Sequence, residues 1–393
     1  MESKNDFSFE DLVDVFDSME KMHPNLFFHI TKSKFEKELY KSKENWDNLD
    51  IYEKNYELMR LSALIGDFHT SVMPTIQSNY TYPYRVSKCK EGYFITNCAQ
   101  KSFADKNMYA QILAINGLEI DELKEIVGKI ICEEVGVFEK KFCYILSCPL
   151  YLKIAKVVDS NAVELTLKKD GQVYNVEVSP ALEKVGNKVM IWLYTKKKAN
   201  FEFVDNGKYF YIDINKFYRD KNMNLNKLYC QAMKAIDARE PFIVDVRGNT
   251  GGHYDLFKKI VEQINVEEIK GYCLIDRKTC SAAVMTAKAL KNAGFILVGE
   301  PTSQPSTFYG GIINLETKSG MNFDVATSLV DDNQQRHTKF IPRSVKFDDK
   351  PLQPDIYIEP SIQDHRSGND PALEYCKKNI SKFAETNRDA DYF

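Results

Sequence analysis

Segments with a strand pattern and segments with a helix pattern alternate between residues 208 and 299. Short apolar runs such as "PFIVDV" and "GYCLI" are typical of buried strands, and amphipathic stretches such as "YDLFKKIVEQI", typical of helices, lie between them. This alternation predicts an α/β fold with a mainly parallel sheet and crossover helices. No other feature of the chain constrains its architecture so strongly.

Two regions with other patterns precede the α/β region. Near the N-terminus, apolar residues recur at helical spacing over 8–22, 33–44 and 51–65, and Pro24 ends the first of these segments. We therefore expect residues 1–74 to form an N-terminal helical unit.

The next region changes to the strand period. Alternating runs surround the turn sequences Asn116–Gly117 and Asp170–Gly171, which are typical of hairpins. We expect residues 75–180 to form a separate strand-rich module and residues 181–393 to form the α/β core.

Composition and charge argue against several other classes of protein. The 393 residues are 44% hydrophobic and 28% charged, a profile typical of two or three globular domains. The net charge of −3, from 53 basic and 56 acidic residues, argues against a nucleic acid or an anionic membrane as the main partner. No apolar run approaches the roughly 20 residues that span a bilayer, so we expect no membrane insertion.

The N-terminal sequence and the cysteines bear on location and cofactors. "MESKNDFSFEDLVDVF" lacks the basic region and apolar core of a secretory signal, and the nine cysteines are scattered and odd in number. Both observations favour a cytoplasmic protein. Because the sequence contains no paired CxxC and no HExxH, we expect no structural metal.

Two loops that follow buried strands carry the residues of a candidate site. Ligands of open α/β sheets bind at this end of the strands. The first loop, "VDVRGNTGGHYDLF", contains Gly251 and Gly252, whose backbone N–H groups can approach a ligand closely. The second, "DRKTC", leads to Ser281 and Ala282 at the start of a helix. Such a serine either caps the helix or acts as a nucleophile beside an oxyanion hole, and the loops alone leave both roles open.

Six segments form an ordered series along the chain. The α/β region contributes "DVRGNTGG", "TCSAA", "VGEPT" and "LQPDIYIEPSIQDHRSGNDPALEYCKKNI", and the preceding regions contribute "LSALIGDFHTSV" and "YAQILAINGLEIDEL". In this order they resemble the S41 family of serine peptidases, which includes C-terminal processing (tail-specific) and tricorn-core peptidases. "DFHT" is similar to the DxHT segment of the tricorn-like branch, and "YAQILAING" is similar to the core of a PDZ-like insert. The resemblance covers nearly the whole chain.

The resemblance implies a crotonase- or ClpP-like α/β core that carries Ser281 as the nucleophile of a serine endopeptidase. It also implies an oxyanion hole formed by the amide of Ala282 and the amide of either Gly251 or Gly252. The substrates would be peptides or unfolded proteins, and no cofactor would be needed.

The general base implied by the resemblance is a histidine. The processing peptidases use a lysine in the loop after the strand that follows the serine helix, but this chain has no Lys or Arg between Lys291 and Lys318. The DxHT segment supplies His69 instead, and Glu300 and Asp67 are candidates for the residue that orients it.

One departure from the family pattern leaves other functions open. Phe68 stands where the DxHT segment commonly has glycine, and a bulky ring beside the base would change access to the site. The second hypothesis is therefore a catalytically silent peptide- or ligand-binding protein on the same fold. A third is an acyl-CoA enzyme of the crotonase type, although the sequence shows no basic phosphate clamp.

Overall fold

The computed structural model describes residues 3–4, 6–132, 136–182, 184–185, 188–189, 200–218, 225–338, 341–342, 345 and 350–389. The chain divides into two compact units, each built from several segments of the sequence. Unit 1 comprises Met1–Thr195, Tyr309–Asp331 and Gln335–Lys346, and unit 2 comprises Lys196–Phe308, Asp332–Gln334 and Phe347–Phe393. The ranges 1–74 and 75–180 thus both fall in unit 1, together with three segments of the expected core, 181–195, 309–331 and 335–346.

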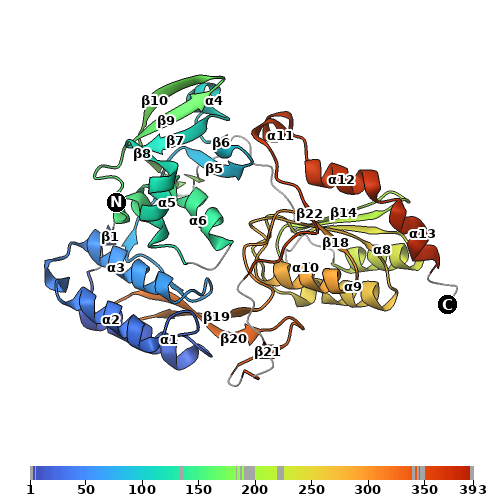
Figure 1. Cartoon of the computed structure of the whole chain (residues 1–393), viewed down its shortest axis with the longest axis horizontal. Helices are drawn as coiled ribbons and strands as arrows, with labels where there is room; N and C mark the ends of the chain where they lie inside the picture. The colour runs from blue at the N-terminus through green and yellow to red at the C-terminus, as the bar shows by residue number, and fades with distance from the viewer. Residues whose placement is uncertain are drawn as a thin grey trace. The chain divides into compact units, whose positions relative to one another are not determined.

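Unit 2 is built around one six-stranded sheet (Figure 1). In sheet order, its strands are β14 (Phe201–Asp205), β15 (Phe210–Ile214), β16 (Phe242–Asp245), β17 (Gly271–Ile275), β18 (Ile296–Gly299) and β22 (Ile356–Tyr357). The strands from β15 to β22 in this order are parallel, and β14 pairs antiparallel with β15 at one edge. The predicted α/β class is confirmed.

Helices cover both faces of this sheet. One apolar core holds side chains from the sheet and from α8 (Leu225–Asp237), α9 (Asp255–Val266) and α10 (Ala282–Asn292). A second core holds side chains from the sheet and from α12 (Pro371–Asn379) and α13 (Lys382–Asp389), which follow the short helix α11 (Ile362–Ser367). Within β16, Val244 belongs to the first core and Ile243 to the second, because successive side chains of a strand point to opposite faces.

The N-terminal part of unit 1 contains the three expected helices. They are α1 (Phe9–Met22), α2 (Lys32–Lys43) and α3 (Ile51–Leu64), with the short 3₁₀ helix η1 (Trp46–Asn48) before α3. Capping boxes formed by Ser8 with Asp11 and by Asp50 with Glu53 begin α1 and α3. As predicted, α1 ends before Pro24.

The strand-rich part of unit 1 is an antiparallel sheet. Its main path is β10 (Gln172–Val178), β9 (Val163–Lys169), β7 (Gln111–Ile115), β6 (Gly92–Cys98) and β5 (Tyr84–Cys89), and β8 (Leu118–Glu119) pairs with β7. The predicted turns are confirmed: Asn116–Gly117 joins β7 to β8, and Asp170–Gly171 joins β9 to β10. Asn116 and Asp170 have φ values of 49° and 50°, which suit two-residue hairpin turns.

Four helices and six short strands complete this part. The helices are α4 (Lys101–Asn107), α5 (Ile120–Gly128), α6 (Val137–Ile145) and α7 (Pro149–Ile154). The short strands pair as β1 (Ser3–Lys4) with β3 (Ile76–Gln77), β4 (Tyr80–Thr81) with β11 (Ala181–Leu182), and β12 (Lys184–Val185) with β13 (Lys188–Val189).

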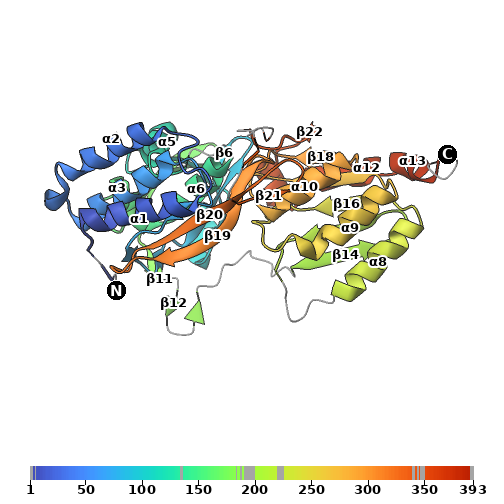
Figure 2. The same ribbon diagram turned by 90° about the horizontal axis from the view of Figure 1, so that it is seen from below.

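A hairpin from the C-terminal half of the sequence also belongs to unit 1. Its strands are β19 (Phe308–Glu316) and β20 (Asn322–Val330), and β20 also pairs with β2 (Ser71–Val72) and β21 (Arg336–His337). Figure 2 shows the hairpin beside α1. No pattern in the sequence predicted the pairing of β2 with β20, which brings residues about 250 positions apart into one small sheet.

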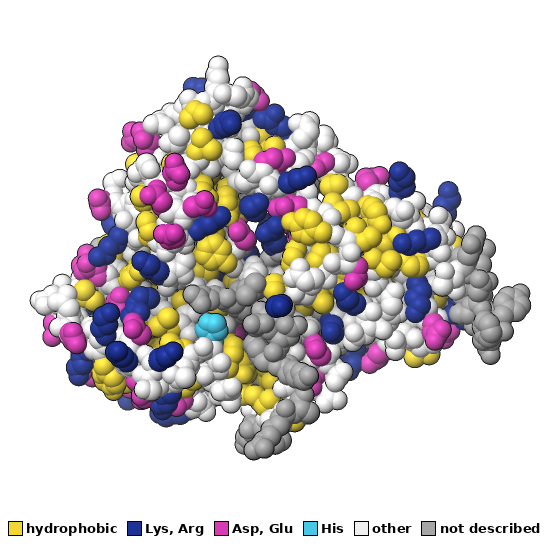
Figure 3. All heavy atoms as spheres, viewed as in Figure 1, with side chains coloured by type: hydrophobic (Ala, Val, Ile, Leu, Met, Phe, Trp, Pro, Cys, Tyr) yellow, Lys and Arg dark blue, Asp and Glu magenta, His cyan; other side chains and the backbone are white. Residues whose placement is uncertain are grey.

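Among the residues that the structure describes, no helix is long and apolar enough to cross a bilayer. On the face drawn in Figure 3, basic and acidic side chains are intermixed.

Candidate active site

Ser281 lies just before α10 in a backbone conformation that non-glycine residues rarely adopt. Its φ is 53° and its ψ is −121°, and such strain costs on the order of 1–3 kcal/mol. Ser281 occupies the N-cap position, yet its side chain makes no capping hydrogen bond to the described first turn of the helix. Helix capping therefore does not explain this serine, which stands half-buried at the positive end of a helix dipole.

The side chain of Gln304 holds the serine backbone in place. Its Oε1 accepts hydrogen bonds from the Ser281 N–H at 2.6 Å and from the Cys280 Sγ at 2.9 Å. Gln304 is completely buried in the loop after β18, and the neighbouring Ser303 Oγ donates to the Thr279 carbonyl at 2.9 Å. No sequence motif points to Gln304, because its role depends on this loop packing against the serine loop.

The glycine loop after β16 touches the serine directly. A Cβ atom on Gly251 would lie 2.7 Å from the Ser281 Cβ and 3.2 Å from the Ala282 nitrogen, so only glycine fits there. The Gly251 N–H donates to the Asn249 Oδ1 at 2.8 Å and is thus already used. Among the described residues, no protein group accepts a hydrogen bond from the N–H of Gly252 or Ala282.

An ion-pair network fixes the base of the same loop. The Arg247 guanidinium donates to both carboxylate oxygens of Asp245, at 2.9 and 2.6 Å, and to both of Asp370, at 2.8 and 2.6 Å. Asp370 also caps α12 by accepting from the Leu373 N–H at 3.0 Å. Arg247 therefore braces the loop through two bidentate pairs, one with Asp245 and one with Asp370.

Glu300 has an ionic partner within unit 2. Its Oε1 accepts from the Arg277 Nε at 2.5 Å, and the same guanidinium reaches the Glu359 Oε1 at 3.0 Å. Burial raises the pKa of the Glu300 carboxyl above its ordinary value, while the Arg277 charge lowers it. The predicted orienting role of Glu300 toward His69 stays a prediction.

His69 lies on the loop between α3 and β2 of unit 1. The loop begins at Gly66, whose φ of 77° ends the helix. The Asp67 Oδ1 accepts the His69 backbone N–H at 3.0 Å, and the Thr70 Oγ1 accepts the Ala326 N–H from β20 at 3.0 Å. The loop is thus secured both to itself and to the hairpin strand β20.

The imidazole of His69 is buried, with only 4% of the residue exposed. The pKa of the His69 ring lies below the ordinary value of a histidine, and burial is the main cause. The Lys140 ammonium lowers the pKa further, whereas the Asp67 carboxylate and a hydrogen bond to the Tyr309 backbone partly offset the decrease. The lowered pKa favours the neutral imidazole, which is the form that a general base requires.

Asp67 is held by a second histidine that no sequence pattern singled out. The His23 Nδ1 accepts the Asn25 N–H at 3.0 Å, so its Nε2 carries the proton that it donates to the Asp67 Oδ2 at 3.2 Å. Both side chains are almost completely buried. Asp67 therefore binds His23 and the backbone of His69, and acts on the His69 ring through its charge.

Phe68, the departure from the family pattern, packs beside the base. Its ring centroid is 5.3 Å from that of His69, and the rings meet edge to face. The ammonium groups of Lys140 and Lys141 lie 5.4 and 5.1 Å from the Phe68 centroid. The ring thus contacts the candidate base on one side and carries two ammonium groups within cation–π distance.

Unit 2 brings together Ser281, Gly251 and Ala282, and unit 1 contains His69. The pairing of Ser281 with His69 stays a prediction. Among the residues that the structure describes, no three His, Cys, Asp or Glu side chains are grouped as metal ligands.

Comparisons with known proteins identify the fold. No family model and no curated protein matches the sequence, but solved structures match over nearly its whole length. Mature CPAF in complex with lactacystin has a TM-score of 0.67 at 12% identity, with 97% of this chain and 98% of that chain covered. Mature CPAF alone has a TM-score of 0.65 at 13% identity, with 95% and 96% covered.

The fold is that of the S41 peptidases. The S41 fold confirms the predicted fold class, a crotonase-like core with a PDZ-like insert.

Proposed function

We propose that the protein is a serine endopeptidase that hydrolyses peptides or unfolded proteins by acyl transfer through Ser281. The conformation of Ser281 carries this proposal: it is strained, its side chain does not cap the helix, and a buried glutamine holds it beside Gly251, where any Cβ would collide with the serine. Strain of this kind is maintained by its surroundings at functional sites. The S41 fold supports the same conclusion.

In the proposed reaction, the Ser281 Oγ attacks the carbonyl carbon of the scissile bond while His69 accepts the hydroxyl proton. The tetrahedral intermediate collapses, the C–N bond breaks, and His69 gives the proton to the leaving amine. His69 then takes a proton from water, and the water oxygen attacks the acyl carbon. The ester C–O bond breaks as His69 returns the proton to the Ser281 Oγ, which releases the carboxylic acid product and restores the serine.

The developing oxyanion needs two N–H donors in the low-dielectric site. We assign these to Ala282 and Gly252. The reason is that the Gly251 N–H already donates to Asn249, whereas the other two amides have no described protein acceptor. The N-terminus of α10 adds its dipole at the same position.

Only a neutral His69 can accept the serine proton. Because burial lowers the pKa of His69, the base remains neutral to a lower pH than an exposed histidine would. Activity should therefore fall on acidification, with the midpoint below the ordinary histidine pKa of about 6.5.

Reaction with a fluorophosphonate tests the proposal against the silent-protein hypothesis. Intact mass should show one adduct on the wild-type protein, peptide mapping should place it on Ser281, and Ser281→Ala should remove it. Thr286→Ala, which changes another hydroxyl on α10, should label normally. Absence of any adduct on a folded wild-type protein would refute the enzymatic function.

A further inference from the structure

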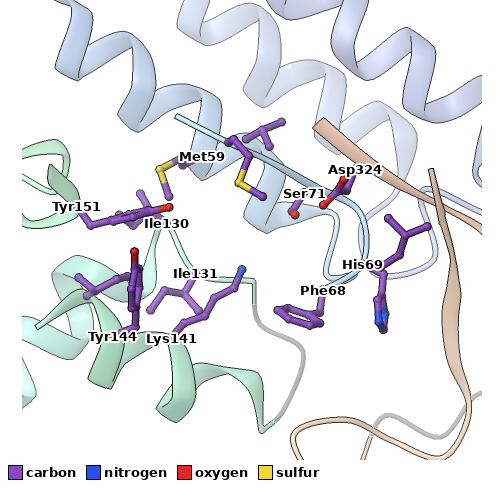
Figure 4. A pocket seen from close by; sticks show the side chains of 14 residues that line it. Met59, Phe68, His69, Ser71, Ile130, Ile131, Lys141, Tyr144, Tyr151 and Asp324 are labelled. Carbon is purple, nitrogen blue, oxygen red and sulfur yellow. The ribbon is translucent and has the colours of Figure 1, made fainter. Parts of the chain in front are cut away.

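A cavity of about 270 Å³ lies within unit 1, beside the loop that carries His69 (Figure 4). Its walls come from three parts of the unit: α3 and β2, the α5–α7 region, and the β19–β20 hairpin. The lining side chains are mostly apolar, namely Met59, Phe68, Val72, Met73, Ile130, Ile131, Tyr144, Ile145, Tyr151 and Ile312, with His69, Ser71, Lys141 and Asp324 among them.

Large apolar side chains are exposed around this cavity. Met73, Tyr144 and Ile312 are exposed by 45%, 53% and 51%, although all three line it. They come from segments far apart in the sequence, so their convergence is a property of the fold. Exposed apolar groups gathered at a cavity are typical of a binding site rather than of ordinary surface.

Phe68 connects the cavity to the candidate base. Figure 4 shows its ring pointing into the cavity toward Lys141, while the His69 ring projects from the other side of the same loop. An occupant of the cavity would therefore contact the residue directly before the base. Phe68 therefore supplies an apolar wall of the cavity, at a position where the family commonly has glycine.

The chemistry of the walls selects the kind of occupant. The Lys141 ammonium over the Phe68 ring disfavours a cationic group, and Asp324 together with the apolar walls disfavours an anionic one. The volume lies just below the usual range for small-molecule sites, about 300–1,000 Å³. One large uncharged side chain matches both properties.

We propose that this cavity binds a large apolar side chain of the substrate, of the size of Leu, Met or Phe, at a position close to the scissile bond. The proposal rests on the proposed peptidase function. Burial of such a side chain in place of serine should raise kcat/KM by about 10- to 100-fold.

Peptide series test this preference. Otherwise identical peptides carry Phe, Leu, Ser or Lys at each position flanking the cleavage site, and kcat/KM is measured for the wild type and for Ile312→Glu. The wild type should prefer Phe and Leu over Ser and Lys by at least 10-fold at one position. Ile312→Glu should reduce that preference at least fivefold, because it places a charge at the rim. Val173→Glu changes a residue of the same unit that is 58% exposed and away from the cavity, and it should keep the wild-type preference.

Binding to Ser281→Ala, measured by calorimetry, separates this proposal from the peptidase function. The Phe peptide should bind at least 10-fold more tightly than the Ser peptide, and Ile312→Glu in the same background should remove the difference. Equal binding of the two peptides, or equal effects of Ile312→Glu and Val173→Glu, would overturn the cavity proposal even if the wild type labels with fluorophosphonate. Selective binding by a protein that neither labels nor hydrolyses would instead overturn the peptidase function.

Discussion

Gly251 offers the sharpest test of the serine site, because its neighbour Gly248 provides a matched control in the same loop. Both glycines have positive φ, 104° and 71° respectively. A Cβ on Gly251 would lie 2.7 Å from the Ser281 Cβ, whereas a Cβ on Gly248 would meet nothing within 4 Å. Gly251→Ala and Gly248→Ala thus both place an alanine at a positive φ, but only the Gly251→Ala side chain would collide with Ser281.

The size of each effect follows from these distances. The positive φ should lower the free energy of unfolding by about 1–2 kcal/mol in both variants. Restoring ordinary van der Waals contact, at 3.4 Å or more, requires the Ser281 side chain to move by about 0.7 Å (3.4 minus 2.7). The overpacking should cost a further 1–3 kcal/mol or so in Gly251→Ala alone. A displacement of that size should also slow acylation about 100-fold, equivalent to about 2.7 kcal/mol in the activation barrier.

Urea unfolding followed by circular dichroism measures the first effect, and the rate of fluorophosphonate labelling measures the second. We expect Gly248→Ala to label within about threefold of the wild-type rate and Gly251→Ala to label about 100-fold more slowly while remaining folded. Similar labelling rates for the two variants would refute the argument that Gly251 is required by its contact with Ser281.

Three further predictions concern the neighbours of the two predicted catalytic residues. Gln304→Ala should destabilise the protein by about 1–3 kcal/mol, because the Ser281 N–H loses its buried acceptor. The rate of fluorophosphonate labelling should fall at least 10-fold. A labelling rate equal to that of the wild type would show that the glutamine does not hold the serine. Asp67→Asn removes a negative charge that raises the pKa of His69, so the pKa of the ring should fall. The acidic limb of the pH–activity profile should then move to lower pH, and the titration of the His69 ring measured by NMR should shift in parallel. A shift to higher pH would contradict the electrostatic reasoning. Cys280→Ser should retain at least a third of the labelling rate, because a hydroxyl can replace the thiol as a donor to the same glutamine oxygen; near-complete loss would point to Cys280 as the reactive group.

The sequence predicted those features of the fold that depend on local patterns. The alternation of strands and helices, the turns at Asn116–Gly117 and Asp170–Gly171, and the end of α1 before Pro24 are all confirmed. Each follows from period, turn chemistry or capping within a few residues. The pairing of β2 with β20 was missed, since strand propensity says nothing about which distant partner a strand finds.

The site shows the same division between local and distant information. Motifs indicated the glycine loop and Ser281, and the structure places them in contact. Gln304 and His23 were missed because each is a single polar residue whose role arises from one long-range hydrogen bond. A buried side chain with one such partner leaves no spacing or repeat in the sequence.

The late position of the β19–β20 hairpin has a consequence for biosynthesis. A ribosome that has translated as far as Phe308 has already made Ser281 and its supporting loop. It has not yet made Tyr309, whose backbone bonds the His69 ring, or Ala326, which ties down the neighbouring Thr70. On the proposed mechanism, a nascent chain that ends before the hairpin would hold a serine without an anchored base, so peptide cleavage would begin only after the β19–β20 hairpin has been synthesised.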